Sequence, residues 1–134
     1  MFTYETTVKL HQTDAAGVCF FGNYFHIAHD AYEAFMASID YSLRYIIDAD
    51  PDVVLIVHAE ADYKKPVFGG DKVTVRTSLE ELGRTSFRLK HTVLNAAGET
   101  AAEVSTVHVA VNKESKRSVR LNDRLAAGLK TLQS

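Results

Sequence analysis

The spacing of apolar residues changes twice along this 134-residue chain. Residues 2–11 alternate loosely between apolar and polar side chains, which predicts a β-strand. Across residues 23–39 the apolar side chains recur every three or four positions, which predicts an amphipathic helix with a broad apolar face. Gly22 or Asn23 is the expected cap of that helix.

After Pro51 the chain has the pattern of strands to about residue 112, with two-residue alternation clear from residue 71 to residue 95. β-Branched residues are frequent there, as is typical of strands, and the Ala-Ala-Gly-Glu stretch at 96–99 has the composition of a hairpin turn. Shorter helical patterns occupy residues 41–48 and 120–132. The four strands expected in this part cover residues 53–63, 71–82, 85–95 and 100–111.

The resulting order is one strand, one long helix and four further strands, which is an α+β arrangement. Short links make the last strands antiparallel neighbours, and we expect a curled antiparallel five-stranded sheet wrapped around one long central helix. The chain length fits a single domain over residues 1–134. One helix cannot cover both faces of such a sheet, so the free face or edge is expected to contact a second copy of the chain.

Composition narrows the class of partner. The formal net charge is -2, which argues against nucleic-acid and membrane-surface binding. No apolar run approaches the roughly 20 residues of a membrane span, and the first ten residues lack the pattern of a signal peptide. Cys19 is the single cysteine, expected as a small apolar residue and not as a nucleophile, and no internal disulfide can form. We therefore expect a cytoplasmic protein.

The stretch HQTDAAGVCFFGNYF (residues 11–25) contains one carboxylate, followed by small residues and then by aromatic ones. Asp14 has two interpretations. It can cap a local turn, as aspartates in loops commonly do. Alternatively, the small residues admit a ligand, and the following helix offers unpaired N–H groups that stabilise an oxyanion. In that case Asp14 attacks the substrate or deprotonates water, and the sequence does not decide between the two.

The stretch TDAAGVCFFGNYFHIAHDAYEAF (residues 13–35) resembles the signature of the 4-hydroxybenzoyl-CoA thioesterase family of hotdog-fold proteins. In that family an Asp-x-x-Gly-Val/Ile segment, an aromatic pair and Asn-Tyr precede the central helix, and the strand order agrees as well. Within the family, the stretches QTDAAGV, HDAYEAF and VHAEADYKKPVFGGD are most similar to the 1,4-dihydroxy-2-naphthoyl-CoA hydrolases of phylloquinone and menaquinone synthesis.

The resemblance implies a hotdog acyl-CoA thioesterase and assigns roles to matching positions. Asp14 matches the catalytic carboxylate, and Phe21 matches the position whose backbone N–H polarises the thioester carbonyl. Some relatives have histidine where this chain has Phe21, so assistance by histidine is not expected there. The expected substrate-pocket residues are Gly17, Val18, Asn23 and Tyr24, of which Gly17 lets the acyl group approach. The expected CoA-binding residues are Arg84, Ser86, Lys64 and Lys65, with Lys113 and Arg117 less specific.

The implied reaction needs no cofactor and no metal, because a thioester is already activated. The implied partners are the acyl-CoA substrate and further copies of the chain, first as a dimer and then as a tetramer. The acyl group that the resemblance favours is 1,4-dihydroxy-2-naphthoate. The alternatives are a thioesterase for short or medium-chain or 4-hydroxybenzoyl substrates, and a hotdog module that binds acyl-CoA without turnover.

Several histidines are weaker candidates. His26, His29 and Glu33 lie near one helical face and form a polar surface stripe, an acid–base cluster or half of a metal site, of which the first is favoured. His91 lies on an apolar strand face and is expected to be a satisfied core histidine. Whether His108 pairs with it across strands is open.

Overall fold

Five strands and three helices make up the computed structural model, which describes residues 1–133. The strands are β1 (Phe2–Thr7), β2 (Asp52–Tyr63), β3 (Lys72–Leu82), β4 (Ser86–Leu94) and β5 (Thr100–Asn112). The helices are α1 (Asn23–Ser38), α2 (Leu43–Asp48) and α3 (Asp123–Lys130), with a 3-10 turn at Leu10–Gln12. Neighbouring strands are all antiparallel, in the order β1-β3-β4-β5-β2, as expected of a five-stranded antiparallel sheet.

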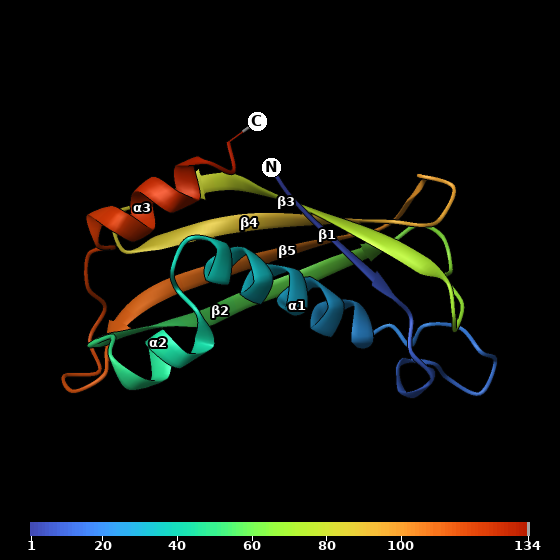
Figure 1. Ribbon diagram of the computed structural model, residues 1–134, viewed down its shortest axis with the longest axis horizontal. Helices are drawn as coiled ribbons and strands as arrows, with labels where there is room; N and C mark the ends of the chain where they lie inside the picture. The colour runs from blue at the N-terminus through green and yellow to red at the C-terminus, as the bar shows by residue number, and fades with distance from the viewer. Residues whose placement is uncertain (134) are drawn as a thin grey trace.

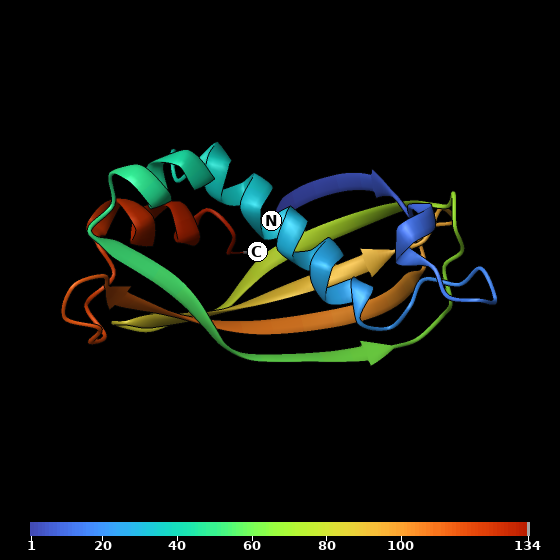
Figure 2. The ribbon, with the colours of Figure 1, turned by 90° about the horizontal axis from the view of Figure 1, so that it is seen from below.

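The sheet is curled, and the three helices lie on one side of it (Figure 1; Figure 2). α1 contacts β1, β3 and β5 across the inner face, whereas α3 contacts the end of β3. The α+β class and the curled antiparallel sheet therefore agree with expectation. The central helix has 16 residues and shares its side of the sheet with the two shorter helices.

The buried side chains recur at the predicted spacing, every second residue on the strands and every third or fourth residue on α1. On β3 the buried side chains alternate as Val73, Val75 and Thr77, and β4 continues the same face. Each fully buried aliphatic or aromatic side chain contributes about 1.5–3 kcal/mol, so the burial of this shared face stabilises the sheet against the helices. The buried residues of α1 are Tyr24, Ile27, Ala28, Ala31, Tyr32, Phe35 and Met36, which confirms the predicted apolar stripe.

The first strand is shorter than the expected range of 2–11. β1 ends at Thr7, after which the Lys9 N–H donates to the Gln12 side chain (2.8 Å) and the chain enters a 3-10 turn. Leu10, an apolar position within the predicted strand, is 88% exposed. The prediction was wrong at this end because a local side-chain hydrogen bond competes with sheet pairing.

The two short helices are confirmed, and both have side-chain caps. Ser42 caps α2 by accepting the Tyr45 N–H, and Asn122 caps α3 by accepting the Leu125 N–H. Asn122 also accepts the Tyr41 hydroxyl (2.7 Å), which ties α3 to the segment after α1. Within residues 1–133, no helix has both the length and the apolarity needed to cross a membrane.

β2 is an edge strand whose central side chains remain exposed. Leu55, Ile56 and Val57 are 46%, 43% and 60% exposed. Next to them, the pairing with β5 shifts register between Ile56 and His58, which bends the strand locally. A long apolar edge of this kind is a surface to which another strand can add.

Candidate active site

Asp14 lies in a tight, exposed loop between β1 and α1. Its Oδ1 accepts the N–H groups of Ala16 (2.8 Å) and Val18 (3.2 Å), and its own N–H donates to the Val18 carbonyl (2.9 Å). Gly17 has a φ of +76°, a left-handed conformation that glycine adopts without strain. Asp14 Oδ1 therefore caps the local turn, as the first interpretation expected. Asp14 Oδ2 accepts no hydrogen bond within residues 1–133.

One carbonyl joins this loop to the start of α1. The Gln12 carbonyl accepts the Phe20 N–H (2.9 Å) and the Asn23 side-chain N–H (2.8 Å), and Gln12 is itself buried. The Asn23 side chain, expected in the substrate pocket, is therefore bound to Gln12 and fixes the helix relative to Asp14. Gln12 was not among the expected site residues, because a single glutamine in a loop forms no pattern.

The start of α1 presents two backbone N–H groups outward. The Phe20 carbonyl accepts an N–H from the helix (2.9 Å), and the Phe21 carbonyl accepts another (3.3 Å) together with the Tyr63 hydroxyl (2.9 Å). The carbonyl and N–H of a trans peptide point in opposite directions, so the N–H groups of Phe21 and Gly22 face away from the helix. Neither donates a hydrogen bond within residues 1–133. Unpaired N–H groups at a helix start, reinforced by the helix dipole, are able to stabilise an oxyanion.

Tyr63 was also missed by sequence reasoning. It is the last residue of β2, and its contact with Phe21 joins positions 42 residues apart. Its ring also packs edge-on against Tyr24 (centroids 5.2 Å apart). No local pattern reveals such a pairing, although an aromatic residue at the end of an expected strand is a weak signal.

A surface groove of about 320 Å³ begins beside the outward amides. Val18, Phe21 and Tyr24 line it together with Lys64 and Lys65. Lys65 pairs with a glutamate of the β4–β5 turn, whereas Lys64 forms no ion pair within residues 1–133. The groove therefore joins the expected carbonyl site to two of the expected CoA-binding residues.

The link between β3 and β4, where Arg84 and Ser86 occur in the sequence, lies at the opposite end of the sheet from the loop between β1 and α1 that contains Asp14 (Figure 1). Arg84 and Ser86 come after the last residue of β3. The first residue of β3 pairs with the last residue of β1, which precedes the Asp14 loop. The 11-residue strand spans roughly 36 Å, so a single chain does not bring Arg84 and Asp14 together. Within one chain, the structure therefore does not place Arg84 and Ser86 beside the Asp14 loop.

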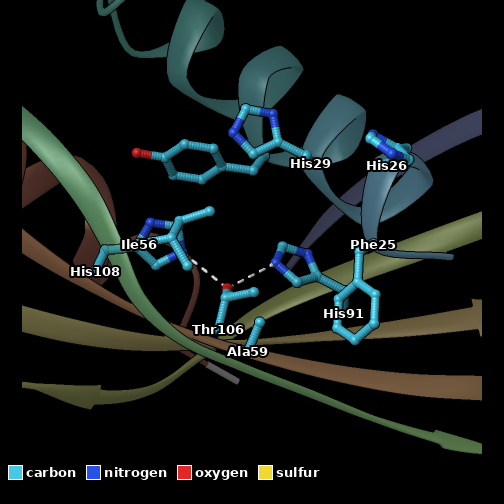
Figure 3. Close-up of a pocket in the computed structure, with 9 residues that line it drawn as sticks. Phe25, His26, His29, Ile56, Ala59, His91, Thr106 and His108 are labelled. Atoms are coloured by element: carbon cyan, nitrogen blue, oxygen red, sulfur yellow. Dashed lines mark hydrogen bonds between the residues drawn. The ribbon is translucent and has the colours of Figure 1, made fainter. Parts of the chain in front are cut away.

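A cavity of about 230 Å³ lies between α1 and the sheet (Figure 3). Phe25, in the first turn of α1, is one of its walls. Its walls are largely apolar, and His91, Thr106 and His108 add polar groups on the side of β4 and β5. The lining residues are Phe25, His26, His29 and Tyr32 of α1, Ile56 and Ala59 of β2, His91 of β4, and Thr106 and His108 of β5.

Three hydrogen bonds connect the polar side chains on the sheet side of the cavity. Thr77 Oγ1 lies 2.8 Å from His91 Nδ1, His91 Nε2 lies 3.3 Å from Thr106 Oγ1, and Thr106 Oγ1 lies 2.8 Å from His108 Nε2. Burial, followed by the effect of His29, lowers the pKa of His91 to about 4. Burial, followed by the effects of His91 and His29, lowers the pKa of His108 to about 3. Both rings are therefore neutral at pH 7. His91 is confirmed as a satisfied core histidine, and His108 is joined to it through Thr106.

His26, His29 and Glu33 are all exposed and do not converge. The two histidines line the cavity, whereas Glu33 lines a different surface hollow beside Asp30 and Tyr4. Within residues 1–133, no group of three or more histidine, cysteine, aspartate or glutamate side chains is arranged to hold a metal ion.

Cys19 is 4% exposed, and its thiol lies 3.7 Å from the Phe20 carbonyl oxygen. Burial, with the nearby Asp14 charge as the second cause, raises the pKa of the thiol above its usual value. A buried and protonated thiol is a poor nucleophile, so the structure leaves Asp14 as the candidate for the chemistry.

Hydrolysis of an activated ester requires one group that attacks or activates water and others that hold the developing oxyanion. Asp14 and the amides of Phe21 and Gly22 are the candidates for these two roles, and both lie near the start of α1. Together with the curled sheet, they are what is expected of one class of protein, the hotdog-fold thioesterases.

Known proteins with related chains belong to the same class. Residues 8–129 match the thioesterase-like superfamily. The chain is 34% identical to a 1,4-dihydroxy-2-naphthoyl-CoA hydrolase of Trichodesmium erythraeum (strain IMS101), over 99% of this chain and 98% of that protein. It is 28% identical to the crystal structure of a 1,4-dihydroxy-2-naphthoyl-CoA thioesterase from Synechocystis, which covers 98% and 96% of the two chains with a TM-score of 0.90. A gentisyl-coenzyme A thioesterase structure is also 28% identical, with coverage of 95% and 98% and a TM-score of 0.85.

The chain belongs to the thioesterase-like superfamily. The family expected from the Asp14 motif, hotdog-fold hydrolases of CoA thioesters, is thereby confirmed.

Proposed function

We propose that this protein hydrolyses an aromatic acyl-CoA thioester, with 1,4-dihydroxy-2-naphthoyl-CoA as the substrate. The names of its relatives support the substrate. One observation carries the proposal: the Asp14 carboxylate lies in a loop that Gln12 ties to the outward N–H groups of Phe21 and Gly22.

In the proposed reaction the thioester carbonyl oxygen accepts the N–H groups of Phe21 and Gly22, which stabilise its developing charge. Asp14 Oδ2 either attacks the carbonyl carbon, giving an anhydride that water then hydrolyses, or takes a proton from the attacking water. In both routes the C–S bond breaks, CoA leaves as the thiol and the acyl group leaves as a carboxylate. No metal or cofactor enters this scheme, because the thioester is already activated.

The two hollows suit the two parts of the substrate. The cavity beside α1 has the apolar walls that an aromatic acyl group needs. The groove contains Lys64 and Lys65, whose charges match the phosphates of CoA. Binding through these exposed charges should weaken as salt is added.

A second copy of the chain is part of the proposal. Two β2 strands paired antiparallel about a two-fold axis would cover the exposed Leu55, Ile56 and Val57. The same pairing would bring the far end of one copy, which carries Arg84 and Ser86, to the Asp14 end of the other. In such a dimer, Arg84 and Ser86 of one subunit could bind CoA at the Asp14 site of the other subunit, although they lie far from Asp14 within one chain. Two such dimers would form the expected tetramer.

The test is hydrolysis of CoA thioesters by the wild-type protein and the Asp14→Asn variant, followed by release of free thiol. The panel contains the 1,4-dihydroxy-2-naphthoyl, 4-hydroxybenzoyl, benzoyl, acetyl and palmitoyl esters. We expect a preference for the naphthoyl ester and a kcat at least about 100-fold lower in Asp14→Asn, as is usual when a catalytic acid or base is removed.

Asp71→Asn is the matched control, because Asp71 also accepts a loop N–H, that of Phe68 (2.9 Å). This variant should retain wild-type turnover. Equal losses in both variants would mean that Asp14 only shapes its loop. Acyl-CoA binding without turnover of any ester would identify a binding module in place of an enzyme.

A further inference from the structure

The loop before α1 is paired with a segment of the link between β2 and β3. In this pairing the Cys19 N–H donates to the Val67 carbonyl (2.8 Å), and the Gly69 N–H donates to the Gly17 carbonyl (3.0 Å). The two bonds flank an isolated antiparallel bridge, so they have the pattern of a very short strand pair. The link therefore holds the second half of the loop in a fixed position.

The second half of the loop in turn carries both parts of the proposed catalytic site. The Val18 N–H donates to Asp14 Oδ1 (3.2 Å), and the Val18 carbonyl accepts the Asp14 N–H (2.9 Å). Three residues after Val18, the same stretch of chain reaches Phe21 and Gly22, whose N–H groups point outward. The position of the link relative to the loop therefore affects the distance between the carboxylate and these amides.

Gly69 of the link lies against Thr13, the residue before Asp14. A Cβ atom at position 69 would be 3.0 Å from Thr13 Cγ2, whereas carbon atoms in contact prefer about 3.5–4.0 Å. The Thr13 side chain is fixed in its orientation, because its hydroxyl donates to the Leu10 carbonyl (2.7 Å). The backbone conformation does not require glycine at position 69, since the neighbouring Gly70, and not Gly69, has a positive φ (+89°). Close contact is therefore the reason for a residue without a side chain.

We propose that Gly69 is a positioning residue for Asp14, because the absence of a side chain lets the link hold the loop at the distance from the amides that the reaction needs. This inference rests on the proposed function. A side chain at position 69 could relieve its contact with Thr13 in two ways. Either Thr13 moves and displaces Asp14, which follows it in the chain, or the link moves and lengthens the hydrogen bond between Gly69 and Gly17. In both cases the carboxylate moves relative to the amides.

The first variant is Gly69→Ala, which adds one methyl group at an exposed position. A displacement of a few tenths of an ångström should lower kcat about tenfold, given that a misplacement of about 1 Å can cost about 100-fold. KM should stay within about twofold of the wild-type value, because Gly69 lines neither the groove nor the cavity. A wild-type kcat in Gly69→Ala, or a change in KM alone, would overturn the inference.

Thr13→Ser is the rescuing variant. Serine lacks Cγ2 but keeps a hydroxyl that can donate to the Leu10 carbonyl, so the contact is removed while the turn is preserved. When Thr13→Ser is added to Gly69→Ala, kcat should return to within about twofold of the wild-type value. Thr131→Ser is the matched control, because the Thr131 hydroxyl also donates to a carbonyl three residues earlier (2.6 Å). It should not restore kcat, and a failure of Thr13→Ser to do so would contradict the proposed role.

A third combination distinguishes positioning from a general loss of structure. If Gly69 acts through Asp14, adding Gly69→Ala to Asp14→Asn should not lower the remaining rate further. A further tenfold loss in the double variant would mean that position 69 affects the reaction by another route, and the inference would fail.

Backbone NMR spectra separate this inference from the proposed function, because they do not depend on turnover. The amide resonances of Asp14 and Val18 should shift in Gly69→Ala and return toward their wild-type positions when Thr13→Ser is added. If they do so but the wild type hydrolyses no ester, the proposed function fails and the placement of the loop by Gly69 stands. If the wild type hydrolyses esters through Asp14 and Gly69→Ala keeps the wild-type kcat, the inference fails and the thioesterase stands.

Discussion

The two carboxylate oxygens of Asp14 have different surroundings, and this affects how the residue can be probed. Oδ1 accepts two N–H groups of its own loop, whereas Oδ2 has no donor within residues 1–133. Asparagine retains a carbonyl oxygen that can replace Oδ1, so Asp14→Asn preserves the loop while removing the reactive oxygen. The turn-capping and catalytic interpretations of Asp14 are therefore compatible, because each concerns a different oxygen.

The Tyr63 hydroxyl positions the peptide that contains the Gly22 N–H, since it donates to the Phe21 carbonyl of the same peptide (2.9 Å). Tyr63→Phe should lower kcat about 5–10-fold, the value of one modest hydrogen bond, with KM unchanged because the ring still lines the groove. Tyr45→Phe is the control, since its hydroxyl makes no hydrogen bond within residues 1–133. A rise in KM with unchanged kcat would assign Tyr63 to binding instead.

The buried histidines make stability depend on pH. Their pKa values are about 4 for His91 and about 3 for His108, below the ordinary value of 6.5 that the unfolded chain has. Between the folded and unfolded pKa values the unfolded state binds more protons than the folded state. The contribution of the neutral histidines to the free energy of unfolding is therefore complete above pH 6.5 and decreases as the solution is acidified toward pH 4 and pH 3. At pH 5 the free energy of unfolding should be lower than at pH 8 by about 2 kcal/mol for each of the two histidines.

Urea unfolding at fixed protein concentration measures this dependence. In His108→Phe, the difference in the free energy of unfolding between pH 8 and pH 5 should be about half of the wild-type difference. The exposed His11 provides the control, since His11→Gln should leave the difference intact. An equal drop in all three proteins would assign the acid sensitivity to other groups.

At the scale of elements, α3 depends on a cap with two functions. The Asn122 side chain accepts the Leu125 N–H (2.8 Å) and the Tyr41 hydroxyl (2.7 Å). Asn122→Ala should lower the free energy of unfolding by about 2 kcal/mol, because a cap is lost and a partly buried hydroxyl loses its acceptor. Ser42→Ala, which removes only the single cap bond of α2, should cost less than half as much. Similar costs in chemical denaturation of the two variants would argue against the tie to Tyr41.

Elements with a strong internal period were predictable from the sequence, and features that depend on distant partners were not. The stripe of α1 and the alternation of β3 follow from local spacing, and both are observed. The end of β1 depends on the Gln12 side chain, which no alternation reveals. The Asp14 motif identified the loop, but the contact of Tyr63 with Phe21 and the distance to Arg84 depend on tertiary structure.

At the scale of the whole molecule, β2 determines the assembly that we propose. Val57 is 60% exposed at the centre of this edge strand, so Val57→Lys should convert a dimer to monomers by placing a charge in the interface. Ile47→Lys on α2, 64% exposed and outside that edge, should leave the assembly unchanged. Size-exclusion chromatography with light scattering distinguishes these outcomes, and a dimeric Val57→Lys protein would show that the interface lies elsewhere.

The outward amides at the start of α1 have an evolutionary consequence. Both donors belong to the main chain, and the side chains beside them, Phe20 and Phe21, are 46% and 61% exposed. Mutation can exchange these side chains while the peptide groups retain their direction. In the proposed enzyme the groups that polarise the carbonyl are therefore inherited with the backbone, and the substrate range can diverge between descendants without loss of the reaction.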